Sequence, residues 1–246
     1  MTMTPEPAGV PGGRFTLGVL GASGGVGSSA LATACAVRAA AARREVALVD
    51  GHPWGGGLDV MAGLDLEPGL RWSALRDVRG DVDPQRLVGE LPATSSGLRC
   101  LSWGVPPAGE EPSGPEPVLS AVRAAVELSV LDLPRPATPA IGHQRWWGVC
   151  DAVVLVVEAS VTGIGAATAV APGVEGLAGI VLRLPTPLPD KVIGATLGAP
   201  VLARLGEDRT VRVILERGGA VGSDSGPLAD AADEVLECVL PRIRAA

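Results

Sequence analysis

The sequence of 246 residues contains no tyrosine, one phenylalanine and one lysine, Lys191. Long apolar runs are also missing, because none reaches the roughly 18 residues that a membrane-spanning helix needs. The N-terminus lacks the basic segment followed by an apolar segment that marks an export signal. These absences predict a cytoplasmic protein with no transmembrane segment, and they exclude reactions that depend on a tyrosine.

Positive charge is scarce as well. The net charge is -7, the cations are almost all arginines, and no basic run occurs. Proteins that bind nucleic acids gain much of their affinity from lysines and arginines that displace counterions from the phosphates. The composition therefore predicts a protein that does not bind nucleic acid.

The sequence has no C-x-x-C pair and no Cys/His pair at the spacing of metal ligands. Its four cysteines are scattered: Cys35, Cys100, Cys150 and Cys238. We expect them to be reduced and mostly buried, as is usual for cytoplasmic thiols. The two histidines, His52 and His143, have no partner visible in the sequence, and we expect them at the surface or in loops.

Short apolar runs alternate with helical patterns along most of the chain. Proline and glycine dominate residues 1–13, which predicts a disordered tail before a single domain of residues 14–246. Strands are predicted at 14–21, 45–50, 97–105, 129–132, 150–160, 179–185 and 199–208, and helices at 29–44, 83–92, 118–128 and 228–243. This alternation favours an α/β fold, with a doubly wound, mainly parallel sheet and helices on both faces.

The stretch GASGGVGSSALATA, residues 21–34, joins the first predicted strand to the first helix. At such a junction, free backbone N–H groups and the positive end of the helix dipole converge and bind phosphate groups. Glycine permits the tight turn and the close approach of a ligand. The candidate nucleotide-binding residues are Gly21, Ser23, Gly24, Gly25, Val26, Gly27, Ser28 and Ser29.

Two families use such a loop, and the first has the dinucleotide-binding Rossmann fold. The letters GASGGVG resemble the start of a short-chain dehydrogenase, and Asp50 ends the second strand, where a carboxylate binds the ribose of NAD. Those enzymes use a Tyr/Lys pair for proton transfer, whereas this chain has no tyrosine and only Lys191. The dehydrogenase reaction is therefore excluded, and an NAD(P)-binding sensor or inactive relative that uses the loop from Gly21 to Gly27 stays as an alternative.

The second is the deviant Walker A loop of the MinD/ParA group, which reads K-G-G-x-G-K followed by serine or threonine. The matching residues are Gly24, Gly25, Val26, Gly27 and Ser29. Ser23 stands at the signature lysine and Ser28 at the P-loop lysine. The loop thus resembles that of a P-loop ATPase in which serines replace both lysines.

Further segments resemble this group in the expected order. EVALVDGHPWGGGLDVMAGLD resembles the segment with the catalytic aspartate, here Asp50, and LSVLDLPRP resembles the Walker B strand, with Asp132 in place. CDAVVLVVEASVTGIGAATAV resembles the next strand and helix, and LGAPVLARLGEDRTVRVILERGG the late loop that reads the base. The resemblance implies that ATP, if it binds, is held with Mg²⁺ by Ser29, Asp50 and Asp132.

Within the group, GGGLDVMAGLDLEPGLRWSALRDV resembles TadZ/CpaE-like and septum-site-determining (Ssd-like) proteins. This resemblance implies a localisation or assembly factor for a Tad/Flp-type pilus or related secretion system, or a role in septum-site placement. A pilus or secretion ATPase or another assembly component would be its partner, and the cell pole or septum its place of recruitment. Members of that family usually carry an N-terminal receiver-like domain, which we expect this chain to lack.

The two serines limit what the loop can do. Lysines neutralise charge on the transferred phosphoryl group, whereas the hydroxyls of Ser23 and Ser28 carry no charge. We therefore expect a pseudo-ATPase with little or no ATP hydrolysis, in which Asp50 only occupies the family's catalytic position. Nucleotide binding stays open, and so does replacement of a lysine by an arginine such as Arg183 or Arg217. The remaining alternative is a ligand-free scaffold.

Two expectations concern the surface. The MinD/ParA group commonly dimerises across the nucleotide, and a homodimer of this chain would rest on apolar contacts because the lysine that reaches across is missing. Trp72 either packs in the core or faces a partner together with Trp54, and the pair Trp146 and Trp147 is typical of a core or an interface.

Overall fold

The structure is a computed structural model that describes residues 14–53, 55, 57–103, 114–135, 144–183, 186 and 188–240. The predicted tail at residues 1–13, Trp54 and His143 lie outside this part of the chain. Within it, the strands and helices build a single α/β domain, as the sequence predicts.

The described residues form one sheet of seven strands, in which every neighbouring pair is parallel. The strands are β1 (Phe15–Gly21), β2 (Val46–Asp50), β3 (Arg99–Leu101), β4 (Leu128–Leu133), β5 (Ala152–Glu158), β6 (Leu177–Arg183) and β7 (Val201–Leu205). Most of their apolar residues are buried, on both faces, as expected of a parallel sheet that helices cover on both sides. Each predicted strand overlaps an observed one: β4 begins one residue before and ends one residue after its predicted range, β6 begins two residues earlier than predicted, and β3 is only three residues long.

The helices lie in the connections between strands and, for the last two, after β7. They are α1 (Ser28–Ala41), α2 (Leu58–Met61), α3 (Trp72–Leu75), α4 (Pro84–Gly89), α5 (Glu116–Ala125), α6 (Gln144–Trp147), α7 (Val161–Val170), α8 (Asp190–Leu197), α9 (Thr210–Glu216) and α10 (Pro227–Val239), with a short 3-10 helix at Ala171–Gly173. No helix in the described ranges is both long and apolar enough to cross a membrane.

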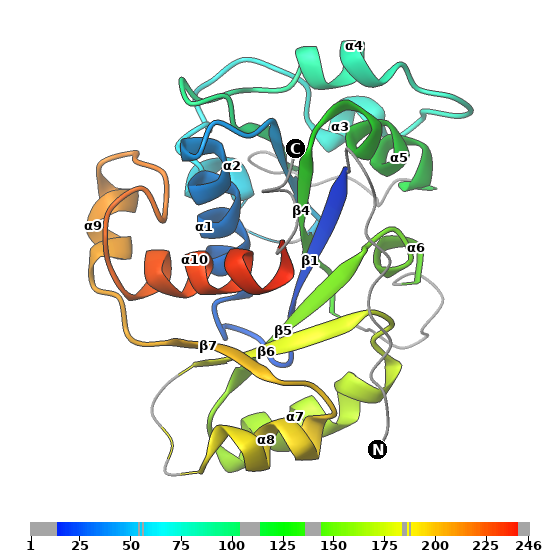
Figure 1. Ribbon diagram of the computed structural model, residues 1–246. Coiled ribbons are helices and arrows are strands. Elements are labelled where there is room, and N and C mark those ends of the chain that lie inside the picture. The colour runs from blue at the N-terminus through cyan, green and yellow to red at the C-terminus, as the bar shows by residue number, and fades with distance from the viewer. Residues whose placement is uncertain are drawn as a thin grey trace.

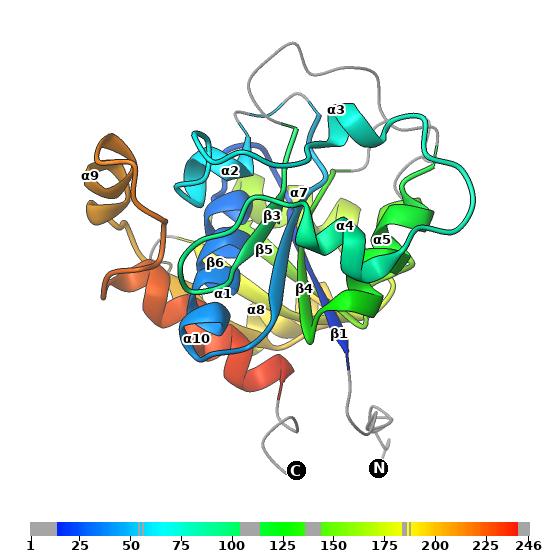
Figure 2. The same cartoon turned by 90° about the horizontal axis from the view of Figure 1, so that it is seen from above.

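Two hydrophobic cores lie on opposite faces of the sheet. Leu17 of β1 packs in the core that contains Cys35 of α1 and Ala232 of α10. Leu20 of the same strand packs in the other core, which contains Val122 of α5. Figures 1 and 2 show α1 and α10 side by side on one side of the sheet, and Figure 2 shows α4 and α5 on the other. The predicted covering of both faces is therefore confirmed.

Tryptophans fill the second core close to the end of β2. Trp72 is fully buried, and its ring centroid lies 5.7 Å from that of Trp103 and 5.5 Å from that of Trp146. Trp147 is also buried. Trp72 is thus a packing residue and does not face a partner, because no part of its ring is left at the surface.

The strand order brings the sequence-predicted aspartates together. The order is β3-β2-β4-β1-β5-β6-β7, so β1 lies between β4 and β5. In the Rossmann order, 3-2-1-4-5-6, strand 1 is instead the neighbour of strand 2. Here β4 lies between β1 and β2, and Asp50 of β2 is in register with Asp132 of β4. The topology is therefore not that of the Rossmann alternative.

Candidate functional site

The loop between β1 and α1 has the backbone conformation of a phosphate cradle. Gly25 and Gly27 have φ angles of 71° and 96°, in the left-handed region that L side chains rarely adopt. The amide of Ala22 donates to the carbonyl of Val156 at 2.9 Å, which ties the start of the loop to β5. Gly24 and Gly25 are exposed. Successive amides in such turns form concave sites that bind anions.

The first turn of α1 retains free donors. No side chain caps this helix, and its first turn contains no acidic residue. By contrast, the hydroxyl of Ser160 accepts a hydrogen bond from the amide of Gly163 and caps α7. The first N–H groups of a helix have no partner within the helix. In α1 they are therefore available to an anion, and the helix dipole favours negative charge at this end.

The predicted loop residues do not all present side chains to a ligand. Val26 is 3% exposed and packs in the core beside α1, so only its backbone can contribute. A Cβ atom at Gly21 would lie 2.9 Å from the hydroxyl of Ser28, which shows that the loop folds back over its own start. Ser23, Ser28 and Ser29 are partly exposed. The loop thus offers hydroxyls and amides but no positive charge of its own.

Asp50 is held in place from several sides. It is 2% exposed, and its two carboxylate oxygens accept hydrogen bonds from the amides of His52 and Leu58 at 2.9 and 3.1 Å. Its backbone carbonyl accepts from the indole N–H groups of Trp72 and Trp103. Burial raises the pKa of Asp50 to about 6, and these amide hydrogen bonds only partly oppose the effect.

Asp132 and His52 form a second part of the site. Asp132 is 1% exposed, and its Oδ1 atom has no hydrogen-bond partner in the described part of the chain. The Nε2 atom of His52 lies 3.6 Å from that oxygen. Burial alone would lower the pKa of His52, but its contact with Asp132 and the charge of Asp50 raise it. The expectation that His52 lies in a loop is confirmed, and the fold also brings it beside a carboxylate 80 positions away in the chain, which no sequence signal indicated.

The residues at this edge of the sheet could hold a metal ion only if the phosphates of a bound nucleotide supplied further ligands. No three His, Cys, Asp or Glu side chains among the described residues gather as a metal site would require. The unsatisfied Oδ1 of Asp132 and the hydroxyl of Ser29 are hard oxygen donors of the type that Mg²⁺ prefers. Proteins usually hold Mg²⁺ through one or two side chains, waters and the phosphates of a substrate. Asp50 could at most hold a water of the ion, since its oxygens are already engaged.

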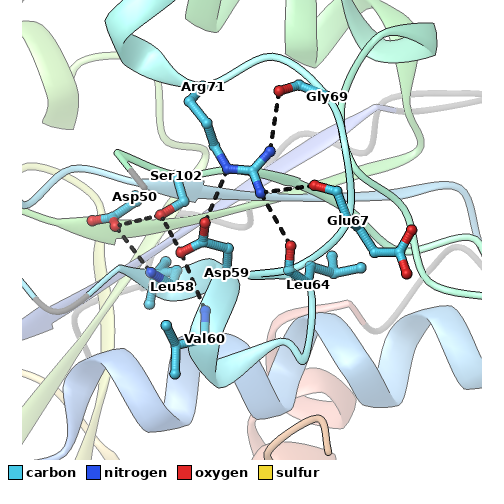
Figure 3. A network of polar contacts seen from close by, with 9 residues as sticks. All are labelled: Asp50, Leu58, Asp59, Val60, Leu64, Glu67, Gly69, Arg71 and Ser102. Atoms are coloured by element: carbon cyan, nitrogen blue, oxygen red, sulfur yellow. Dashed lines mark hydrogen bonds and ion pairs between the residues drawn. The ribbon is translucent and has the colours of Figure 1, made fainter. Parts of the chain in front are cut away.

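Arg71 of the GLRW motif stabilises the segment that follows Asp50, as Figure 3 shows. Arg71 donates from Nε to the buried Asp59 at 2.9 Å and from Nη2 to the carbonyl of Leu64 at 3.0 Å. The hydroxyl of Ser102 lies 3.0 Å from Asp59 Oδ1 and 3.3 Å from Asp50 Oδ2. The motif thus fixes the segment after β2, and through Ser102 it connects to the candidate site.

Two arginines lie against the loop. Nη1 of Arg183, the last residue of β6, donates to the carbonyl of Gly25 at 2.6 Å. Nη1 of Arg135, which follows β4, lies 3.5 Å from the position that a Cβ atom on Gly24 would occupy. No contact in the described residues joins Arg217, at the end of α9, to the loop. The sequence leaves Arg183 and Arg217 as candidates to replace a lysine, whereas no sequence signal singles out Arg135.

The strand order and the glycine loop between β1 and α1 define a P-loop domain with the MinD/ParA fold. The structure is similar to a ParA family ATPase from Chlorobium tepidum TLS, with a TM-score of 0.75, 16% identity, and 93% of this chain and 99% of that chain covered. It is also similar to a MinC:MinD cell division protein complex from Aquifex aeolicus, with a TM-score of 0.74, 17% identity, and 93% of this chain and 96% of that chain covered. A third similar structure is MinD with Mg-ADP from Pyrococcus horikoshii OT3, with a TM-score of 0.68, 16% identity, and 94% of this chain and 98% of that chain covered.

Fewer proteins are similar to the chain in sequence than in structure. No protein-family model matches the chain. Two uncharacterized proteins of Mycobacterium tuberculosis, Rv3660c of strain H37Rv and MT3760 of strain CDC 1551, are each 35% identical to it over 230 residues. The match covers 91% of this chain and 63% of each relative, so the chain spans less than two thirds of their length. What the comparisons show for this chain is the MinD/ParA-like fold.

Proposed function

We propose that this chain is a nucleotide-binding pseudo-ATPase that holds the phosphates of ATP or ADP in the loop from Gly21 to Ser29. The observation that carries the proposal is an uncapped start of α1 behind a loop with positive φ at Gly25 and Gly27. That arrangement binds phosphate through backbone amides. The MinD from Pyrococcus horikoshii, which shares the fold, was solved with Mg-ADP.

Magnesium is part of the proposal. Ser29 would bind the ion directly, and Asp132 would accept hydrogen bonds from its waters, which would satisfy its unpartnered oxygen. When bound, Mg²⁺ neutralises charge on the β- and γ-phosphates. Asp50 has a supporting position only, because the amides of His52 and Leu58 occupy its oxygens.

Slow or absent hydrolysis follows from the loop sequence. Ser23 and Ser28 replace the two lysines of the Walker pattern and leave the transferred phosphoryl group without its usual positive contacts. Loss of such a charged contact slows phosphoryl transfer on the order of a thousandfold or more. We expect ATP turnover at the background level. Turnover that is clearly above background in the parent chain and abolished by Asp50→Ala would contradict a pseudo-ATPase.

Equilibrium binding tests the nucleotide assignment. ATP, ADP and NADH are titrated into the purified chain with and without Mg²⁺. We expect ATP and ADP to bind more tightly with Mg²⁺ than without it, and NADH to bind weakly, because Asp50 is 2% exposed and not free to take a ribose. Tight NADH binding that is independent of the metal would favour the dinucleotide alternative. Failure of all three to bind would favour the ligand-free scaffold.

We infer the biological role from resemblance alone. The segment around GLRW is similar to TadZ/CpaE-like and Ssd-like proteins, which supports localisation or assembly of a Tad/Flp-type pilus or secretion system, or septum-site placement. A pilus or secretion ATPase is the expected partner. A fluorescent fusion expressed at native level should concentrate at the pole or septum, and a uniform distribution in dividing cells would contradict this role.

Self-association is a separate part of the proposal. A homodimer would bury apolar surface, since the chain lacks the lysine that reaches across the nucleotide in the MinD/ParA group. Sedimentation velocity with and without Mg-ATP measures this directly. A monomer under both conditions at tens of micromolar protein would contradict it and leave the binding proposal unaffected.

A further inference from the structure

We propose that Arg183 and Arg135 supply, from the ends of two other strands, the positive charge that the loop lost with its lysines. The inference rests on the proposed nucleotide site and names the side chains that bind the phosphates there. Ser23 and Ser28 are neutral, and Lys191 is the only lysine in the chain. Any cation at the loop must therefore be an arginine, a histidine or a bound metal ion.

Arg183 makes the direct contact. It ends β6, and its Nη1 atom lies 2.6 Å from the carbonyl oxygen of Gly25 and 3.6 Å from the position of a Cβ atom on Gly27. One guanidinium therefore spans the two glycines whose positive φ angles shape the cradle. A guanidinium has five N–H donors, so the bond to Gly25 leaves others for phosphate oxygens.

Arg135 approaches from the other side. A Cβ atom on Gly24 would lie 3.5, 3.6 and 3.7 Å from its Nη1, Nη2 and Cζ atoms, so the flat face of the guanidinium lies over this glycine. Arg135 follows β4, and Arg183 ends β6, while β1 and its loop lie between those strands in the sheet. The two cations therefore flank the loop.

Neither arginine has a carboxylate partner within the described residues. Eight of the other arginines in the described residues form ion pairs with acids, whereas some, such as Arg14 and Arg43, do not; the eight are Arg38, Arg44, Arg71, Arg86, Arg123, Arg145, Arg204 and Arg212. In an acidic chain, two guanidiniums without a carboxylate partner among the described residues therefore lie on either side of one exposed glycine loop. Arginine recognises phosphate through several hydrogen bonds at once, which suits a diphosphate or triphosphate.

A second observation points to a ligand at this edge. Asp132 is 1% exposed, and its Oδ1 atom has no hydrogen-bond partner among the described residues, with Nε2 of His52 3.6 Å away. It is in register with Val19, two residues before the loop begins. A buried acceptor without a donor is costly unless a ligand or its metal ion completes it. Arg135 and Arg183 could thus bind the phosphates of a nucleotide, and Asp132 could accept hydrogen bonds from the waters of the Mg²⁺ ion that accompanies it.

The test is binding of Mg-ATP, Mg-ADP and inorganic pyrophosphate to Arg183→Gln, Arg135→Gln and the double variant. Arg204→Gln is the matched control, because Arg204 lies on the neighbouring strand β7 but pairs with Asp190. We expect each single change to weaken binding about tenfold and the double change about a hundredfold, with no loss in the control. Affinity should also depend less on salt in the variants.

Rescue separates a binding role from a structural one. Ser28→Lys, added to Arg183→Gln, restores a charge inside the loop and should recover most of the lost affinity. If both single variants bind the probes as tightly as the control variant does, this inference is overturned and the proposed function is unaffected. Tighter binding by Arg183→Gln would also overturn it, since Arg183 would then block the site. If the parent chain binds none of the three probes, both proposals fail.

Discussion

At the scale of single residues, the site depends on charges that are buried next to one another. Asp50 and Asp132 lie in register on adjacent strands and are almost inaccessible to water, and His52 is the nearby group that can become a cation. Asp50 is fixed by hydrogen bonds from two backbone amides and the Ser102 hydroxyl to its carboxylate, and from the Trp72 indole to its backbone carbonyl.

The first prediction concerns the pH dependence of stability. Burial raises the pKa of Asp50 from 3.8 to about 6, so the folded chain binds this proton more tightly than the unfolded chain. Its contribution to the free energy of unfolding therefore falls as pH rises from about 4 to about 6. Asp50→Asn removes this titration. The stability of the variant relative to the parent should rise by about 2 to 3 kcal/mol between pH 4 and pH 7.

Urea unfolding of both proteins at several pH values measures this difference. Asp65→Asn is the control, because Asp65 is exposed and its loss changes the net charge by the same amount. A difference between parent and Asp50→Asn that stays constant over this range would show that Asp50 is not held in a strongly desolvated state.

The second prediction concerns the support behind the site. Arg71→Met leaves the carboxylate of Asp59, which is 2% exposed, without its cation. Breaking a buried ion pair from one side costs about 3 to 5 kcal/mol. In the control Arg86→Met, the lost pair with Glu90 is at the surface, and the cost should be about 0.5 kcal/mol or less. Equal destabilisation of the two variants in urea would contradict the role of Arg71.

At the scale of elements, the packing of α10 on α1 leaves one cysteine thiol buried and another exposed. Its apolar side packs on α1, where Cys35 is fully buried, whereas Cys238 of α10 is exposed. Burial raises the pKa of Cys35 and of Cys150 to about 12, and it raises that of Cys100 well above the usual value. Cys35 and Cys100 are buried, Cys150 is half-buried and Cys238 is exposed, so the expectation of mostly buried thiols is confirmed in part.

This arrangement predicts selective thiol chemistry. At pH 8 a thiol with a pKa near 12 is ionised on the order of a thousandfold less than an ordinary one, and the thiolate is the reactive form. A chromogenic disulfide reagent should therefore modify Cys238 rapidly, and the other three only after unfolding. Cys238→Ser should remove the fast phase. A second fast-reacting thiol in the folded variant would contradict the burial of the remaining cysteines.

At the scale of the whole molecule, the candidate site is assembled from segments that lie far apart in the chain. The loop follows β1, Asp132 lies in β4, and Arg183 ends β6. A ligand that contacts all three should therefore stabilise the global fold, because unfolding any part of the sheet dismantles the site. A ligand at about 100 times its Kd adds about 2.7 kcal/mol to the free energy of unfolding.

For a domain of this size that stabilisation corresponds to a rise of about 5 to 10 °C in Tm. Mg-ADP should produce the rise in a thermal melt, and adenosine, which has no phosphate, should not. A similar rise with adenosine would indicate that the base, and not the phosphates, provides the binding energy.

The sequence by itself determined the local features of this protein. Periodicity and glycine placement gave the positions of the strands, the phosphate-type loop at Gly21 to Ser29, and Asp50 at the end of its strand. These features depend on residues that are neighbours in the chain, so backbone preferences and alternating burial suffice to predict them. The loss of charge at Ser23 and Ser28 is likewise visible in the letters alone.

Only the tertiary structure decided which distant groups meet. The placement of β4 between β1 and β2 brings His52 to Asp132, and the carboxyl ends of β4 and β6 bring Arg135 and Arg183 to the loop. The burial of Trp72 and its bond to the carbonyl of Asp50 depend on the same packing. Contacts of this kind depend on the order of strands in the sheet, and the local preferences of a sequence do not encode that order.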